Sequence, residues 1–324
     1  MSPLLESLFS AEFGYAIVRV MTPLLFPAIG VAFTALAGTI NIALEGIMLV
    51  AAFTGVAVSV LAGSYWISLL AGIGSGILMG SILAYFHLRL KANIILAAVA
   101  LNLFAGGITI FLSFLITGDK GSTSALNSLV FPEIDIPLIE TIPILGTILS
   151  GHNVLTYVAI ISVFIFYLIV FRTPLGLRIR AVGQNSDAAE SVGVNVNRIR
   201  WYALMLSGVF GALGGLYLSM GYVSWFSRDM TAGRGFIAIA ASTLGGNLPL
   251  GTFLASLLFG FVNAVAIYIA TIDVPSELIQ LIPYAVTIIA LAVYSYRANR
   301  TKGKGDGRLP QPDEEIPKPK AGGI

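Results

Sequence analysis

The sequence predicts an all-α fold: a polytopic transmembrane helical bundle of about nine spans, one of them short or broken. Of the 324 residues, 57% are hydrophobic and 10% are charged, and the mean hydropathy is +0.91, whereas soluble domains carry about 25% charged residues. Apolar runs of about 20 residues, long enough to cross a bilayer as helices, follow one another along the chain. The short alternating segments typical of a β-barrel are absent from the sequence.

The predicted spans are, in order, 15–37, 46–62, 65–86, 93–116, 153–171, 201–221, 234–246, 250–270 and 277–296. The segment 234–246 is short for a full crossing, so we expect a partial helix completed by irregular backbone. Residues 1–296 are expected to form a single transmembrane domain. Residues 297–324 are rich in Pro, Gly, Lys and Glu, which predicts a disordered tail.

Basic residues gather on one predicted membrane face if the segment 234–246 does cross the membrane. Two lie in 89–91, five in 172–200 and seven after Tyr296, whereas the loop 117–152 has four acidic residues against Lys120 alone. Cytoplasmic loops are enriched in Lys and Arg. We therefore predict that the C-terminus is cytoplasmic and that the loop 117–152 is external.

Several kinds of site are disfavoured by the sequence. The chain has no cysteine, and two separate histidines cannot build a metal cage unaided, so no metal site is predicted. The segment from Gly246 to Thr252 has the glycine spacing of a phosphate-binding loop but lacks its lysine. We therefore expect no cofactor and no enzymatic activity in this chain. We expect the lipid bilayer to surround the chain and expect no nucleic-acid partner.

Four polar residues in or beside the spans are candidates for a translocation pathway, because polar groups in a membrane require partners. They are Asn41, Glu45, Asn102 and Asn263. Asn41 and Glu45 share a helix face if the backbone there is helical. Glu45 either lines the pathway or has a structural role, as a carboxylate at the membrane interface or as a cap at a break between helices. The pathway reading and the structural reading have similar weight. For Asn102 and Asn263, hydrogen bonding between helices is favoured over a pathway role.

The stretch 172–200 is long for a connector on the basic face. Asp187 and Glu190 have the spacing of a capping box, which predicts a short surface helix, with Gly183 and Gly193 as flexible backbone on either side. A plain solvated loop has about the same weight on physical grounds.

The residues GLRIRAVGQNSDAAESVGVNV in this stretch resemble the coupling loop of ABC-importer permeases of the ribose and branched-chain amino-acid group. Two further segments, AGTINIALEGIMLVAAF (37–53) and GRGFIAIAASTLGGNLPLG (233–251), resemble nucleoside permeases of that group and their simple-sugar relatives, and PYAVTIIAL (283–291) is similar to the same branch. The resemblance covers about residues 20–296.

The resemblance implies a permease subunit in the cell membrane that moves solute, most consistently nucleosides, by alternating access. The implied partners are separate ABC ATPase subunits that use ATP, a second related permease (a heterodimer is favoured over a homodimer) and an external solute-binding lipoprotein. Contact with the ATPase is implied for Gly183, Asn185, Asp187, Ala188, Ala189, Glu190 and Gly193. The alternatives are a permease for ribose or another simple sugar and, less favoured, an ion-coupled secondary transporter.

Overall fold

The computed structural model describes residues 10–126, 128–137 and 145–270, together with 285, 286, 288, 289 and 292. The long helices are α2 (Ala11–Leu36), α3 (Leu44–Ala62), α4 (Tyr65–Ala84), α5 (Ile94–Thr117), α8 (Val154–Arg172), α11 (Val196–Tyr217) and α13 (Pro249–Ile269). The shorter elements are η1 (Tyr85–Arg89), β1 (Glu133–Ile134), α7 (Leu145–Leu149), β2 (His152–Asn153), α9 (Pro174–Gln184), α10 (Ser186–Ser191), η2 (Leu218–Tyr222) and α12 (Arg234–Leu244).

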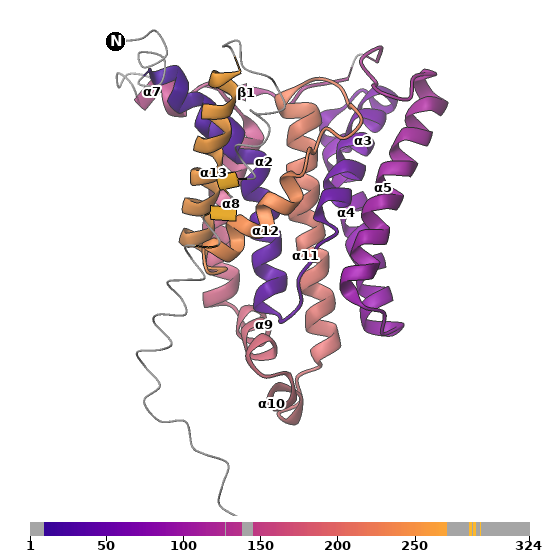
Figure 1. Ribbon diagram of the computed structural model, residues 1–324, viewed down its shortest axis with the longest axis vertical. Helices are drawn as coiled ribbons and strands as arrows, with labels where there is room; N and C mark the ends of the chain where they lie inside the picture. The colour runs from indigo at the N-terminus through magenta and orange to yellow at the C-terminus, as the bar shows by residue number, and fades with distance from the viewer. Residues whose placement is uncertain are drawn as a thin grey trace, which may run out of the picture.

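Seven helices in the described residues are long and apolar enough to cross a membrane, two of them continuing through η1 and η2. The predicted short span corresponds to α12, an 11-residue helix that lies halfway up the bundle (Figure 1). The predicted span 277–296 and the predicted tail 297–324 lie largely or wholly outside the described residues. A helical membrane bundle is thus confirmed, and the count of nine spans stays a prediction.

The bundle is organised around α11, which packs against α2, α3 and α4. A Cβ on Gly76 of α4 would overlap the carbonyl oxygen of Gly208 on α11, and a Cβ on Gly208 would overlap the Gly76 carbonyl. On another side of α11, a Cβ on Gly215 would overlap the backbone of Met48 in α3. These glycines allow the close backbone approach that membrane helices use in place of large apolar contacts.

The two ends of the bundle differ in composition. The turn between α4 and α5, helix α9 and helix α10 lie at the lower end in Figure 1, and this end holds the basic segments 89–91 and 172–200. The loop after α5 and the short β1–β2 pair lie at the upper end. Because cytoplasmic loops carry an excess of Lys and Arg, we expect the lower end to be cytoplasmic.

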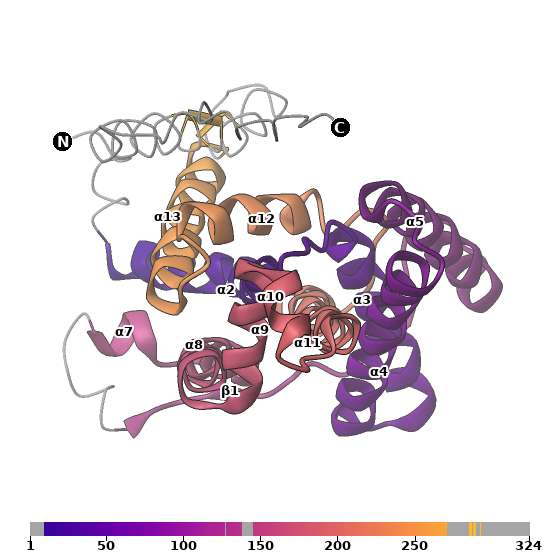
Figure 2. The ribbon, with the colours of Figure 1, turned by 90° about the horizontal axis from the view of Figure 1, so that it is seen from below.

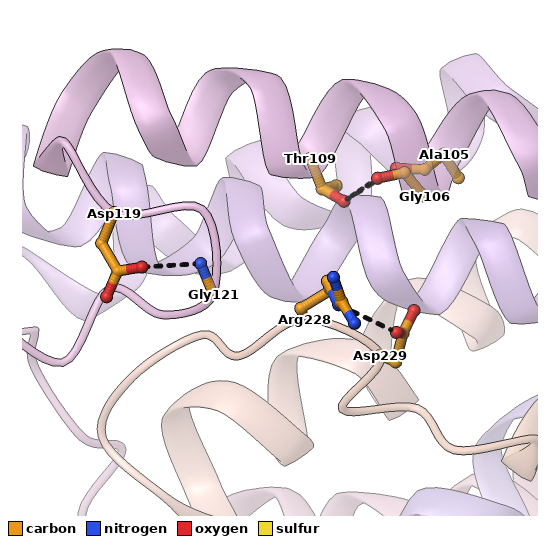
Figure 3. Close-up of polar contacts among 7 residues, drawn as sticks. All are labelled: Ala105, Gly106, Thr109, Asp119, Gly121, Arg228 and Asp229. Carbon is orange, nitrogen blue, oxygen red and sulfur yellow. Dashed lines mark hydrogen bonds and ion pairs between the residues drawn. The ribbon is translucent and has the colours of Figure 1, made fainter.

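The upper end is closed by loops that bond to one another. Thr123 N–H donates to the carbonyl of Phe226, and the N–H of Phe226 donates to the Thr123 hydroxyl. Figure 3 shows the turn at Asp119, whose carboxylate accepts from Gly121 N–H at 2.8 Å, and the Arg228–Asp229 ion pair at 3.3 Å. Because both side chains of that pair are more than half exposed, it adds little to stability.

His152 is a buried residue of this upper end. Its ring stacks on Tyr15 with 4.0 Å between centroids, and its Nε2 lies 2.8 Å from the carbonyl oxygen of Ile148. Nε2–H is therefore the donor in that bond. Burial lowers the pKa of His152 below its usual value of 6.5, so the neutral ring is favoured in the folded protein.

Candidate functional site

Glu45 joins two elements that are far apart in the sequence. Its carboxylate accepts from the N–H of Gly233 at 2.8 Å and from the N–H of Gly235 at 2.7 Å, one bond to each oxygen. These are backbone donors at the start of α12, whose N-cap residue Gly233 offers no side-chain acceptor of its own. A negative charge at a helix N-terminus is favourable. Of the two readings of Glu45, the geometry therefore fits a cap across a helix break.

Asn102 of α5 hydrogen-bonds to backbone groups before and after Glu45 in the sequence. Its Oδ1 accepts from the N–H of Gly46 at 2.8 Å, and its Nδ2 donates to the carbonyl of Ile42 at 3.0 Å. Both partners belong to the start of α3 or to the segment before it. The expected bridging role of Asn102 between helices is thus the one its contacts show. Gly46 permits this approach, because a Cβ there would lie 2.8 Å from Asn102 Oδ1.

Asn41 lies in the non-helical segment between α2 and α3 and is fully buried. Its Nδ2 donates to Ser207 Oγ of α11 at 3.0 Å, and its Oδ1 accepts from Ala43 N–H at 2.9 Å. Because α3 begins only at Leu44, the conditional prediction that Asn41 and Glu45 share a helix face does not apply. Asn41 fixes the break to α11 instead.

Asn263 does not join this group. It lies on α13 and is partly buried, and its Nδ2 donates to the carbonyl of Phe259 one turn earlier in the same helix. The preferred sequence interpretation, a bond between helices, therefore differs from the bond found. An amide at this position can donate to a carbonyl of its own helix, and the sequence does not distinguish that bond from one to another helix.

Glu45, Asn102 and α12 border one surface of the molecule. Glu45 and Asn102 are partly exposed, and Phe236, the residue after Gly235, is 47% exposed. In Figure 2, α12 lies between α13 and α3, with α5 beyond α3. Non-helical backbone and a carboxylate at membrane depth occur where they face protein or water, not lipid. Phe236 and the donor groups of Gly233 and Gly235 were not identified from the sequence, although the glycines flanking Arg234 are a signal for close backbone contact.

The candidates in 183–193, at the lower end of the bundle, belong to two helices, not one. Gly183 lies inside α9, and only residues 186–191 form α10. The N-cap of α10 is Asn185, whose Oδ1 accepts from the N–H groups of Asp187 and Ala188 at 3.1 and 3.0 Å. The prediction that Asp187 is the cap was therefore wrong by two residues, because both Asn and Asp are strong caps and the competing Asn lies just upstream.

The two glycines beside α10 lie in different surroundings. A Cβ on Gly183 would overlap the carbonyl oxygen of Leu36, so this glycine seats α9 against the end of α2. Gly193 has a φ of +86° and open space around it, as expected for a residue that ends a helix turn. Ala188 and Glu190 are exposed on α10, whereas Ala189 is buried with an exposed fraction of 4%.

Comparison with known proteins identifies the family. Residues 15–291 match the family described as branched-chain amino acid transport system, permease component. The chain belongs to this family. It is 36% identical over 294 residues to the guanosine ABC transporter permease protein NupQ of Bacillus subtilis, covering 87% of this chain and 92% of that protein. It is 35% identical over 295 residues to the nucleoside ABC transporter permease protein NupC of Lactococcus lactis, with coverages of 88% and 92%.

The fold has a solved counterpart. PsaBC from Streptococcus pneumoniae in complex with Fab matches with a TM-score of 0.52 and 16% identity, covering 89% of this chain and 94% of that chain. At this identity the likeness concerns the fold alone. The family and the two relatives make the chain a multi-pass membrane permease subunit of an ABC importer.

Proposed function

We propose that this permease carries nucleosides inward across the cell membrane, and that the surface formed by Glu45, Asn102 and α12 is a wall of their route. The cargo proposal is supported by the names of the two relatives, which specify guanosine and nucleosides. The wall proposal is supported by the Glu45 contact, which keeps a carboxylate and broken backbone at membrane depth. Both carboxylate oxygens already accept hydrogen bonds, so Glu45 is not an uncommitted counter-charge for a cation, which suits a neutral solute.

The energy for transport comes from a separate subunit in this proposal. We propose that α10 docks on an ABC ATPase subunit, that a second related permease completes the pathway in a heterodimer, and that an external binding lipoprotein delivers the nucleoside. The exposed Ala188 and Glu190 on a six-residue helix at the basic end support the docking surface. The C-terminus is cytoplasmic in this arrangement.

The absence of cysteine allows a direct test of the wall. Phe236→Cys replaces an exposed side chain on α12, and the matched control Phe164→Cys replaces a 62% exposed phenylalanine on α8. An impermeant, water-soluble thiol reagent should modify Cys at 236 in the assembled transporter and block uptake of labelled guanosine, and excess guanosine should slow the modification. The control should stay unmodified. Equal resistance of both variants would remove α12 from the route.

The docking proposal needs a variant that spares folding. Arginine at Ala189 would disturb a buried contact, so Ala188→Arg alone is the suitable change. It should leave insertion and yield unchanged but reduce uptake at least tenfold, with either loss of the ATPase subunit or ATP hydrolysis that no longer drives uptake. Leu177→Arg, on the exposed face of α9, is the control. Wild-type uptake and assembly in Ala188→Arg would contradict docking through α10.

A further inference from the structure

A cavity with polar and apolar lining residues lies toward the lower end of the bundle (Figure 1), and neither Glu45 nor α12 lines it. Its volume is about 950 Å³. It is lined by η1 and the residue just after it, and by the start of α11 and the residue just before it. Its lining includes Arg89 and Arg198, the aromatic side chains Tyr85, Trp201 and Tyr202, and Asn197. Nothing in the transport route proposed above uses these groups.

The two helices present the same arrangement to this cavity. On η1, Arg89 ends the spanning helix and Tyr85 lies one turn deeper. On α11, Arg198 lies in the first turn, and Trp201 and Tyr202 follow one turn deeper. The helices are in register here, since a Cβ on Gly80 of α4 would lie 2.7 Å from the carbonyl oxygen of Leu204 on α11. Arg89 and Arg198 thus lie at the ends of their helices, and aromatic side chains of both helices lie one turn deeper.

The cations are available for a ligand. Within the described part of the chain, neither the Arg89 nor the Arg198 guanidinium makes an ion pair or a hydrogen bond, and both side chains are exposed. The π-helical geometry of η1 widens the last turn at this point, and single π-turns of this kind are frequent at functional sites.

We propose that this cavity binds an anionic phospholipid of the inner leaflet, with the phosphodiester between Arg89 and Arg198 and an acyl chain along Tyr85 and Trp201. Arginine matches phosphate oxygens in geometry and charge. Tyr and Trp are typical of the bilayer interface, and basic pockets between helices on the cytoplasmic side bind anionic headgroups. The aromatic half belongs to spanning helices, where a soluble ATPase subunit cannot reach, so lipid is favoured over protein as the occupant.

The test measures lipid retained by the purified full chain with its co-purifying subunits. After delipidation, phosphatidylglycerol or phosphatidylcholine is added and bound lipid is counted by native mass spectrometry. Wild type should retain phosphatidylglycerol selectively. The double variant Arg89→Gln/Arg198→Gln should bind it about 10- to 30-fold more weakly, since each basic residue near a membrane surface is worth about one kcal/mol. Arg89→Lys/Arg198→Lys should retain most of the binding.

Lys91→Gln/Arg178→Gln removes two exposed charges from the same end but leaves the cavity intact, and should bind lipid like wild type. Equal retention in all variants would overturn the site. So would displacement of the lipid by inorganic phosphate alone, which would indicate a general anion site. Loss of the ATPase subunit from the Gln/Gln variant with lipid retention unchanged would assign the cavity to a protein interface and overturn it too.

Discussion

The contact between α4 and α11 and the contact between α3 and α12 both place a glycine against backbone, since a Cβ on Gly235 would overlap the backbone of Glu45. They differ in their polar bonds. In the first, Gly76 and Gly208 bring two backbones together with no room for a Cβ, so the fit depends on shape alone. In the second, the Glu45 carboxylate reaches two N–H groups of a short helix that has no capping side chain. The hydrogen bonds of the second contact can exchange their partner for water, whereas the first contact has no such bonds to exchange.

The difference suggests a division of labour within this permease. We expect α3, α4 and α11 to move as a unit and the polar contact between Glu45 and α12 to be one that can open. The apolar residues of α12 pack against α2 and α13 instead. In an alternating-access transporter, the second kind of contact belongs beside the route. The variants below test this division, beginning with the one expected to have the largest effect.

Gly76→Leu should abolish the stable permease. The new side chain would meet the carbonyl oxygen of Gly208 and the Cβ of Ala212, and backbone cannot yield as a flexible side chain can. Overpacking in a close contact costs about 1–3 kcal/mol, and here the obstacle is main chain, so the upper end or more is expected. The measurement is the yield and thermal unfolding of inserted protein. The control is Gly74→Leu on the same helix, where a Cβ meets open space; similar losses in both would contradict the shape argument.

Glu45→Ala should impair transport more than it impairs folding. It leaves the N–H groups of Gly233 and Gly235 without their acceptor, and an unsatisfied buried donor costs about 1–3 kcal/mol. We expect uptake to fall at least tenfold while detectable inserted protein remains. Glu45→Gln should be intermediate, since its single amide oxygen can serve one donor well. Glu12→Gln, an exposed carboxylate on α2, is the control; normal uptake in Glu45→Ala would make α12 independent of this contact.

Asn102→Leu tests whether the same break needs its second support. The change removes both bonds to the start of α3, one to Gly46 N–H and one to Ile42 C=O. We expect a loss of about 1–3 kcal/mol in stability. The matched control is Asn263→Leu, whose amide donates only to its own helix and should change stability by less than about 0.5 kcal/mol. A fall in uptake without loss of stability in the control would return Asn263 to the pathway candidates.

Hydropathy and charge predicted the long helices well. Each spanning helix forms its backbone hydrogen bonds within itself, so its signal lies in a continuous stretch of sequence. The short α12 was also expected from its length. The Glu45 contact was not predictable in detail, since its partners lie 188 and 190 residues away and are backbone groups of glycines. The prediction of Asp187 as the cap failed because Asn185, an equally good cap, lies two residues upstream, and sequence spacing does not rank the two.

The smallest predicted effect concerns pH and the upper end of the bundle. Burial lowers the pKa of His152, so the unfolded chain takes up a proton at a pH where the folded protein does not. Stability is therefore full above the unfolded value of 6.5 and falls as the pH is lowered from 6.5 toward the folded pKa. Thermal unfolding measured from pH 7.5 to 5.0 should show this decline.

His152→Gln should flatten the decline, since Gln cannot take up the proton in this range. If the upper end is only a cover, uptake per folded molecule should be equal in wild type and in His152→Gln at each pH. The stacked contact with Tyr15 would then join the glycine contacts as structural packing. The contrary outcome is a pH profile of uptake that changes with His152→Gln while the unfolding curves of the two proteins coincide. It would place a titrating group of the upper end in the transport cycle.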